Sequence, residues 1–249
     1  MSTPSGFYQD LHKAEQTYSA GSYYYPSLYS SAALKRWGEG RKGGSIRILD
    51  VGCGKGLFLR DFLAGLKAAW SLQPSRVTGL DLVRSPNNLF EEIKPRLEFV
   101  EHNSDGQPLP FANASYDVVT CNHVLEHVFE TEKLVREFHR VLDRKGLCII
   151  SVPNLAAWAN RVGLIFGGQP LGTEIGTEKV TYGFWPSSLQ HKLEPFRPSG
   201  HIRDFTPRGL RDLCRHCGFK TSGWWAQSHG LLARLGPWAG RNIGIILEP

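Results

Sequence analysis

The stretch "ILDVGCGKG", from Ile48 to Gly56, decides the fold class of this chain. Its first residues are apolar and lead into Asp50, after which Gly52, Gly54 and Gly56 stand at every second position. Such a run is typical of a buried strand followed by a turn in which the backbone comes close to a bound ligand. A nucleoside triphosphate, a dinucleotide and a sulfonium cofactor could all use this closeness. The glycines alone therefore leave three classes of ligand open.

Strand and helix patterns alternate around this stretch. The predicted strands cover residues 45–51, 76–82, 96–102, 116–121, 147–153, 219–226 and 242–247. The predicted helices cover residues 56–70, 86–94 and 123–142, with a final helix in which Thr206 is the N-cap, Pro207 the first residue and Gly218 the residue after the C-cap. In the helix over 123–142 we expect a break near Phe129, a restart with Thr131 as N-cap, and an end at Gly146. The alternation predicts an α/β fold, a Rossmann-like doubly wound and mostly parallel sheet with helices on both faces.

The same pattern suggests how the chain is organised. Residues 45–153 form the expected cofactor-binding core, and residues 201–249 add a helix and closing strands to the same domain. Residues 154–200 lose their periodicity over a stretch too long for an ordinary connection, which predicts an insertion or lid with the acceptor site. Residues 1–44 are an aromatic and helical cover. Their Tyr18, Tyr23 to Tyr25 and Trp37 could close over the cofactor, although a hydrophobic cap on the sheet is the preferred interpretation.

Composition limits the classes of partner and compartment. A chain of 249 residues with 41% hydrophobic and 21% charged residues is typical of a soluble globular protein. The net charge is +6, but Lys and Arg are scattered, so nucleic acid is not expected as a partner, whereas an acidic substrate or a lipid surface remains compatible. The five cysteines suggest reduced thiols, and no apolar stretch reaches the roughly 20 residues of a membrane span. The N-terminus lacks the apolar core of a secretion signal, so we expect a cytoplasmic protein in which peripheral membrane contact is open.

The glycine spacing excludes two of the three ligand classes. A phosphate-binding P-loop needs G-x-x-x-x-G-K-[S/T], whereas here Lys55 is followed by Gly56. The dinucleotide fingerprint needs G-x-G-x-x-G, and the third glycine arrives one residue early. Asp50 would also repel a pyrophosphate at this turn, while its charge would favour a cationic ligand.

S-adenosylmethionine fits the remaining features, since it carries an ammonium and a sulfonium and has no phosphate. Its ribose diol needs a carboxylate at the end of the second strand, and Asp81 in "GLDL" stands there. The separation of Asp50 and Asp81 is that of one strand–helix–strand unit. The two aspartates together make the glycine loop a good indication of this cofactor.

With these residues in place, the chain resembles the class I S-adenosylmethionine-dependent methyltransferases. The matching pieces are "ILDVGCGKG", "GLDL", "LPFANASYDVVTCNHVLEHV", "LVREFHRVLDRKGLCIISVPN" and "GHIRDFTPRGLRDLCRHCGF". The resemblance implies a seven-stranded sheet with its last strand antiparallel, and a cofactor across the carboxyl ends of the first four strands. It also implies an enzyme that methylates a small molecule or a glycan or lipid-linked precursor, with oxygen as the expected acceptor atom.

The resemblance also implies the residues that hold the cofactor. Asp50 would bind the methionine ammonium, and Asp81 the ribose hydroxyls. The family places an acidic residue four before the "LPF" leucine, near the adenine amino group, and Asp105 stands there. Because the loop "HNSDGQPLPF" is longer than usual, Asn103 is a second candidate. The further cofactor contacts that the resemblance implies are Gly52, Cys53, Gly54, Gly56, Leu82, Asn122 and His123.

Methyl transfer from a sulfonium is an in-line displacement, so the protein has mainly to position the acceptor and exclude water. A hydroxyl acceptor would also benefit from a general base, for which histidine is best matched to neutral pH. We rank His127 first, His201 second and His123 third, although each could instead be a structural histidine. No metal is expected in this mechanism.

Two short motifs have competing interpretations. "HVLEH" (His123, Glu126, His127) matches the zinc-peptidase pattern H-x-x-E-H, but its place directly after a predicted strand explains it without zinc. Cys214 and Cys217 form C-x-x-C at the C-terminal end of a predicted helix, where helix packing is the preferred interpretation. Three other functions therefore stay open behind methyl transfer: a non-catalytic cofactor-binding protein, a zinc hydrolase, and a nicotinamide oxidoreductase.

One apolar stripe falls within the insertion. Leu155, Trp158, Val162 and Phe166 recur at helical spacing. Such a stripe usually faces the core, so we expect a lid helix packed on the domain. The alternative is a surface for lipid or for an apolar acceptor.

Overall fold

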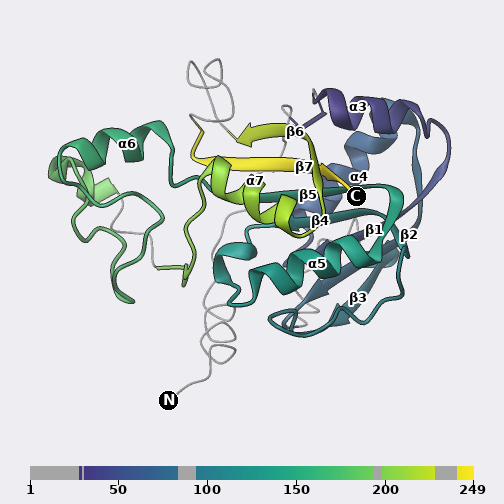
Figure 1. Cartoon of the computed structure of the whole chain (residues 1–249), viewed down its shortest axis with the longest axis horizontal. Coiled ribbons are helices and arrows are strands. Elements are labelled where there is room, and N and C mark those ends of the chain that lie inside the picture. The colour runs from purple at the N-terminus through teal and green to yellow at the C-terminus, as the bar shows by residue number, and fades with distance from the viewer. Residues whose placement is uncertain (1–27, 30, 84–93, 193–197, 228–239) are drawn as a thin grey trace.

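A computed structural model describes residues 28–29, 31–83, 94–192, 198–227 and 240–249, and its central feature is a seven-stranded sheet (Figure 1). The strands are β1 (Ser45–Val51), β2 (Gln73–Asp81), β3 (Leu97–Glu101), β4 (Tyr116–Asn122), β5 (Leu142–Pro153), β6 (Lys220–Gln227) and β7 (Asn242–Glu248). Their order is β3-β2-β1-β4-β5-β7-β6. β1 to β5 pair in parallel, while β7 runs antiparallel to both β5 and β6. The predicted fold class, including the antiparallel last strand, is confirmed.

Helices cover both faces of this sheet. The α-helices are α3 (Ala32–Glu39), α4 (Leu57–Trp70), α5 (Thr131–Val141), α6 (Trp158–Ile165) and α7 (Pro207–His216), with 3₁₀ turns η2 (Lys94–Arg96), η3 (Leu125–His127) and η4 (Ser187–Lys192). Apolar side chains of α3 and α4 share one buried cluster with one face of the sheet, and those of α5 and α7 share a second cluster with the other face. The order of the strands reverses between β1 and β4, and open α/β sheets bind ligands beyond the carboxyl ends of strands at such a point.

The ends of α7 follow the predicted capping residues. The Thr206 hydroxyl accepts a hydrogen bond from the Gly209 N–H at 3.1 Å, and Pro207 begins the helix. Gly218 follows the C-cap with φ +101°, a conformation that suits glycine. Cys214 and Cys217 are both buried and lie in the cluster under α7, so the helix-packing interpretation of C-x-x-C is confirmed. All five cysteines are buried and unbonded to one another.

The predicted helix over 123–142 is wrong in its boundaries. His123 has φ +55°, which takes it out of any helix, and the short turn η3 follows. Thr131 is the first residue of α5 instead of its N-cap, which is Glu130. The helix ends at Val141, and Gly146 lies within the irregular start of β5. There a Cβ would come within 2.8 Å of the Asp117 carbonyl oxygen, so this glycine serves close strand approach instead of a helix end.

The aromatic cover is described only from residue 28 onward. Trp37 on α3 is buried, and its indole N–H donates to the Lys145 carbonyl at 3.0 Å. Trp37 therefore packs as part of a hydrophobic cap on the sheet, which was the preferred interpretation. Tyr18 and Tyr23 to Tyr25, as well as residues 86–93 of the predicted second helix, lie outside the described residues.

The insertion forms a lobe beside the sheet, which we define as residues 154–192 (Figure 1). The predicted inward stripe on its helix α6 is wrong, because Trp158 and Phe166 are 53% and 60% exposed. Asn160 is buried instead, and its side-chain nitrogen donates to the carbonyls of Asn154, Leu155 and Leu171. Asn160 turns inward because its amide satisfies the backbone of the surrounding loops.

Among the helices that the structure describes, none is long and apolar enough to cross a membrane.

Candidate functional site

Two carboxylates stand at the carboxyl ends of neighbouring strands. Asp50 on β1 is only 2% exposed, and one of its oxygens accepts a 2.6 Å hydrogen bond from the Thr120 hydroxyl on β4. Burial raises the pKa of Asp50 to about 7; the hydrogen bond from Thr120 lowers it, and the negative charge of Asp81 raises it further. A carboxylate that is this costly to ionise would be stabilised by a cationic ligand beside it.

Asp81 at the end of β2 holds the glycine loop in place. Its two oxygens accept hydrogen bonds from the N–H groups of Leu82 and Gly54, both at 2.7 Å. Each carboxylate oxygen can accept more than one hydrogen bond, so Asp81 keeps acceptor capacity for a ligand's hydroxyl groups. The predicted contacts Gly54 and Leu82 therefore lie beside Asp81, and they orient it.

The three loop glycines all have positive φ, but they have different structural roles. A Cβ at Gly52 (φ +74°) would lie 2.1 Å from Val124 Cγ2, so this glycine is required for close packing. A Cβ at Gly54 (φ +49°) would meet nothing within 4 Å, so this residue faces open space. Gly56 (φ +79°) is the N-cap of α4. Of Gly52 and Gly54, it is Gly54 that leaves the space a ligand needs.

This difference predicts opposite results for two substitutions of the same kind. Gly52→Ala is expected to destabilise the fold by about 2–3 kcal/mol, because it adds a clash to the strain of positive φ. Gly54→Ala is expected to cost only the strain, about 1 kcal/mol, while weakening the binding of S-adenosylhomocysteine. Chemical denaturation and calorimetric titration measure the two effects. Equal stability losses with unchanged affinity would contradict this assignment.

Cys53 contributes only its backbone to the loop. Its side chain is buried in the cluster under α4, and burial raises the pKa of the thiol far above its usual value. The N–H groups of Gly52 and Cys53 both donate to the Leu80 carbonyl, at 2.7 and 3.1 Å. The loop is thus tied to β2 before any ligand binds.

Two polar atoms at the ends of β3 and β4 are buried without a hydrogen-bond partner among the described residues. They are Asn122 Nδ2 and His102 Nε2. The Asn122 amide oxygen is engaged, accepting from the Ser151 hydroxyl at 2.7 Å, and the backbone N–H of His102 donates to the Asp81 carbonyl. Buried polar atoms without partners are rare, and a bound ligand would satisfy them. His102 was missed from sequence, although it directly follows β3 as Asn122 ends β4.

The two candidates for the adenine contact lie in one turn. The Asn103 side-chain oxygen accepts from the Asp105 N–H at 3.0 Å. The Asp105 carboxylate accepts from the N–H groups of Phe129 and Glu130, at 3.2 and 2.9 Å, just before α5 begins. Asp105 therefore fixes the start of a helix, a structural task that its spacing in the sequence did not reveal.

The residues around the loop fit S-adenosylmethionine, the cofactor that the resemblance implies. Buried Asp50 favours a cation, Gly54 leaves open space, and Asp81 has acceptor capacity for ribose hydroxyls. Asn122 and His102 each offer a buried nitrogen that needs a partner. These features extend across the ends of β1, β2, β3 and β4, as the resemblance led us to expect.

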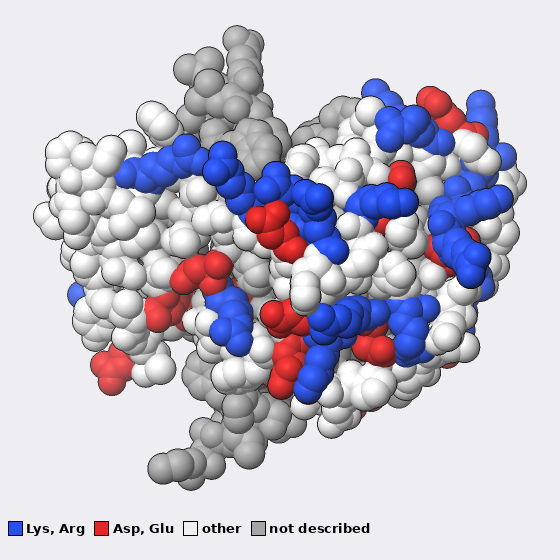
Figure 2. All heavy atoms as spheres, viewed as in Figure 1, with Lys and Arg blue, Asp and Glu red and all other residues white. Residues whose placement is uncertain are grey.

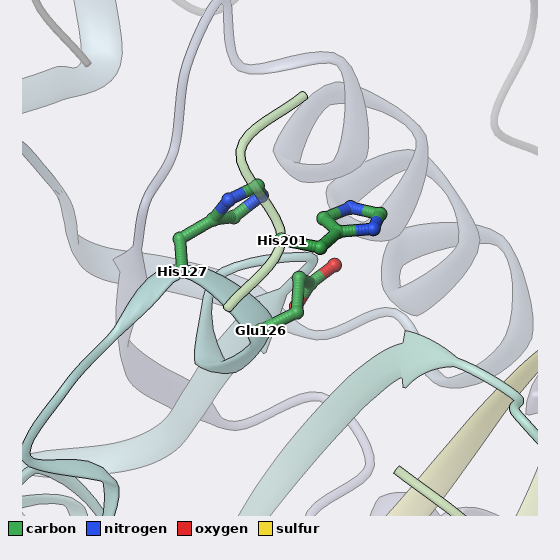
Figure 3. Close-up of side chains that lie close together, drawn as sticks. All are labelled: Glu126, His127 and His201. Carbon is green, nitrogen blue, oxygen red and sulfur yellow. The ribbon is translucent and has the colours of Figure 1, made fainter. Parts of the chain in front are cut away.

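A cluster of Glu126, His127 and His201 forms where the turn η3, which follows β4, meets the segment that carries His201 (Figure 3). The rings of His127 and His201 are 5.0 Å apart between centroids, although the two residues are far apart in sequence. The Nδ1 atoms lie 3.2 Å from the Gly200 carbonyl and 2.8 Å from the Gly172 carbonyl, respectively. Because a carbonyl only accepts, Nδ1 carries the proton in each ring. In neutral His127 this leaves Nε2 as the basic atom, whereas Nε2 of His201 lies 3.1 Å from the Ser199 hydroxyl oxygen.

The electrostatics of the cluster keep His127 neutral. Burial lowers its pKa below the ordinary value, and His201 adds to this, while Glu126, Gly200 and Glu174 oppose it. The Glu126 carboxylate is buried, which alone would raise its pKa, but the hydrogen bond from His123 and the nearby histidines hold that pKa below its usual range. At neutral pH the cluster therefore combines an ionised carboxylate with a neutral imidazole that can accept a proton.

The helical arrangement that the competing zinc-peptidase interpretation of H-x-x-E-H would need does not form. His123 stands outside the turn η3 and its Nδ1 lies 3.2 Å from Glu126 Oε1, so it does not share a helix with His127. One ligand atom from each of Glu126, His127 and His201 lies within 4.8 Å of the other two, so this different set could hold a metal ion. Of the three histidines ranked from sequence, the structure brings His127 and His201 together and places His123 beside Glu126.

Glu174 in the lobe holds the loop that carries His201. One of its oxygens accepts from the N–H and the hydroxyl of Ser199, and the other accepts from the N–H groups of Gly200 and His201. These four bonds are 2.7 to 3.2 Å long, and the side chain is only 10% exposed. Glu174 therefore positions both His201 and the Gly200 carbonyl that orients His127. No motif in the sequence marked it.

We expect Glu174→Ala to destabilise the protein by about 1–3 kcal/mol, because it leaves N–H groups of residues 199–201 without acceptors. Hydrogen exchange of these amides should accelerate more than that of the sheet. Glu39→Ala, which removes an exposed carboxylate of α3, is the matched control and should change neither quantity. Unchanged exchange at 199–201 in Glu174→Ala would contradict the positioning role.

Comparison with known proteins adds independent information about residues 22–222, which match a family model described as a methyltransferase domain. A probable S-adenosylmethionine-dependent methyltransferase of Mycolicibacterium smegmatis is 33% identical over 201 residues, covering 81% of this chain and 62% of that protein. A ubiquinone biosynthesis O-methyltransferase of Rickettsia bellii is 29% identical over 153 residues, covering 60% of each chain. Across the curated relatives that it matches, the chain spans between about a third and three fifths of their length.

A solved structure shows the same fold. The trans-methyltransferase CalH, in complex with S-adenosylhomocysteine, superposes with a TM-score of 0.54 at 16% identity, covering 86% of this chain and 53% of that one. At this identity the likeness concerns the fold alone.

Proposed function

The chain belongs to the methyltransferase domain family, and from that premise we propose that it transfers a methyl group from S-adenosylmethionine to an oxygen atom of a small molecule or of a glycan or lipid-linked precursor. The observation that carries the proposal is the pair of carboxylates, Asp50 and Asp81, on either side of a glycine loop that faces open space at Gly54. A pyrophosphate would be repelled by this pair, whereas an ammonium and a ribose diol would each find a partner.

In this proposal the residues of the loop hold the cofactor. Asp50 binds the ammonium, Asp81 the ribose hydroxyls, and Gly52, Cys53, Gly54, Gly56 and Leu82 form the backbone around them. Asn122 and His123 lie on the methionine side, and Asn103 or Asp105 on the adenine side. When bound, the cofactor supplies a methyl group on a positively charged sulfur, which is an excellent leaving group.

The protein's remaining tasks are to align the acceptor and to take up its proton. The lobe is the proposed acceptor site, because its Glu174 holds the loop of His201 against His127. Neutral His127 would accept the hydroxyl proton at Nε2, while its Nδ1–H stays on the Gly200 carbonyl. His201 is the second candidate for this step. A neutral imidazole and an ionised carboxylate suit a hydroxyl acceptor, and a relative named as an O-methyltransferase supports oxygen as the acceptor atom.

Binding of S-adenosylhomocysteine is the first test. We expect calorimetric titration to detect binding with a Kd in the micromolar range, and thermal unfolding to shift upward with ligand concentration. Incubation with the methyl-labelled cofactor and a cell extract should then transfer label to a small organic fraction. Absence of binding would overturn the proposal, while binding without transfer to any fraction would favour a non-catalytic cofactor-binding protein.

A chelation experiment distinguishes the base from a metal in the same cluster. If His127 acts as the base, methyl transfer should survive extensive dialysis against a chelator at neutral pH. Loss of transfer that returns on adding Zn²⁺ or Mg²⁺ would assign Glu126, His127 and His201 to a metal ion instead. Elemental analysis of the dialysed protein confirms that the metal has been removed.

A further inference from the structure

Large apolar side chains that are exposed to solvent gather in one part of the described chain. Eight of the ten lie between residues 158 and 189; they are Trp158, Leu164, Ile165, Phe166, Ile175, Tyr182, Trp185 and Leu189. Single exposed apolar residues are normal on a monomer, but a gathered patch marks an interaction surface. We call Trp158, Leu164, Ile165, Phe166 and Trp185 the α6 surface.

The apolar side chains of helix α6 face solvent, opposite to what their helical spacing predicts. Its buried residues are Asn160 and Gly163, while Ile165, at 79%, is the most exposed of the large apolar residues. Trp158, Arg161 and Leu164 are three residues apart, so they share the outward face. The helix thus presents apolar side chains and one cation outward, and its inward polar group, Asn160, is fully committed to the surrounding backbone.

A second segment of the lobe completes this surface. The ring of Phe166 stacks on that of Trp185, with centroids 4.2 Å apart and an angle of 16° between the planes. Both rings remain exposed, by 60% and 38%. Together with Trp158, the α6 surface carries two indoles, and indole is the side chain that favours the boundary between lipid headgroups and acyl chains.

The charged side chain that α6 itself contributes is positive. Arg161 is exposed on the outward face of α6, and its guanidinium donates to the Ala156 carbonyl at 2.8 Å. Figure 2 shows basic side chains in a row over α6 and α7. On α7 the bases are Arg208, Arg211 and Arg215, against the single acid Asp212. The whole chain carries a net charge of +6. Anionic headgroups are attracted to such a surface.

We propose that the α6 surface docks on the surface of an anionic lipid bilayer. Figure 1 shows α6 along the outer side of the lobe, away from the sheet, so a flat partner can reach it. With eight residues the helix is about 12 Å long, so it would lie in the plane of the headgroups, with its apolar side chains in the bilayer and Arg161 at the phosphates. Because the lobe also holds the loop of His201, docking would bring the proposed acceptor site to lipid-borne molecules.

Vesicle sedimentation tests the proposal. The full chain is mixed with vesicles of phosphatidylcholine alone, or with about a third of phosphatidylserine to supply the anionic charge. The expected result is binding to the anionic vesicles that Leu164→Ser with Ile165→Ser weakens by about tenfold or more. Phe129→Ser is the matched control, since Phe129 is 47% exposed but lies outside the lobe, and it should bind like the unaltered protein. Arg161→Glu should weaken binding to the anionic vesicles. Thermal unfolding of each variant excludes misfolding.

Three outcomes would overturn the proposal. The unaltered protein could fail to sediment with either kind of vesicle. The variant with Leu164→Ser and Ile165→Ser could bind the anionic vesicles as well as the unaltered protein does, in which case the contact is electrostatic and made by another surface. Light scattering after size-exclusion chromatography could show a dimer that only the serine pair dissociates, which would assign the α6 surface to a second copy of this chain.

Discussion

Asp50→Asn is expected to weaken the binding of S-adenosylhomocysteine by about a hundredfold or more, because it removes the buried charge that would face the ligand's ammonium. The same substitution is expected to stabilise the ligand-free protein above pH 7. Asparagine has nearly the same shape, and its side-chain oxygen can still accept the hydrogen bond from Thr120. Affinity and stability should therefore move in opposite directions.

The pH dependence follows from the pKa of Asp50, which is about 7 in the folded protein against an ordinary value of 3.8 for an aspartate. A group whose pKa is raised by folding stabilises the native state fully below its unfolded pKa, and this contribution is lost as pH rises through the folded pKa. The difference of about three between the two pKa values corresponds to roughly 4 kcal/mol of folding stability, which is lost as pH rises from about 4 to about 7. The variant does not ionise, so its free energy of unfolding should not show this decline.

The affinity for the ligand should depend on pH in the opposite direction to the stability. An ammonium prefers the ionised form of Asp50, so the affinity of the unaltered protein should fall as pH is lowered below about 7. Calorimetric titration and urea denaturation at pH 5.5 and pH 8 measure both effects. Asp212→Asn, at a carboxylate that is 63% exposed, is the control and should alter neither. Unchanged affinity in Asp50→Asn would remove this residue from the cofactor site.

His127→Gln is expected to lower the rate of methyl transfer by about 10² to 10⁴ without changing the affinity for S-adenosylhomocysteine, since it removes the proposed base but leaves the glycine loop intact. The glutamine side chain can still donate to the Gly200 carbonyl and fill the site. The rate of the unaltered enzyme should fall as pH is lowered through the pKa of His127, which lies below its ordinary value. The variant should lack this limb of the profile.

The acceptor identified by label transfer is the substrate for this measurement. His216→Gln, at an exposed histidine of α7 that lies outside the lobe, is the matched control. His201→Gln should have a smaller effect if His127 is the base, and a larger one if the order of the two is reversed. An unchanged rate and pH profile in His127→Gln would exclude this residue from the mechanism.

Much of the fold was predictable because its signals are local. A buried parallel strand is an apolar run, and the interval from Asp50 to Asp81 is set by one strand–helix–strand unit. The caps of α7 could likewise be identified from Thr206, Pro207 and Gly218. The end of α5 could not be predicted, because a glycine such as Gly146 can either end a helix or allow two strands to approach closely, and the sequence does not distinguish the two roles.

The histidine cluster depends on contacts between distant parts of the chain. His127 and His201 were both candidates, but only the folded chain places their rings side by side. Glu174 belongs to no motif, and its four hydrogen bonds exist because the lobe folds back on residues 199–201. Asp105 illustrates the reverse case, since a residue expected at the adenine also fixes the start of α5.

The sequence by itself determined the two carboxylates beside the glycine loop, because spacing along one strand–turn–helix unit dictates where such residues lie. The alternation of strands and helices predicted the mostly parallel sheet, and the resemblance to the methyltransferases implied its antiparallel last strand. Only the tertiary structure decided which face of α6 is buried. A stripe at helical spacing identifies an apolar face but not its partner, and here the unpaired backbone of the surrounding loops drew polar Asn160 inward instead. The apolar face was left exposed in the part of the chain that the structure describes, and it is this face that we propose docks on a lipid bilayer.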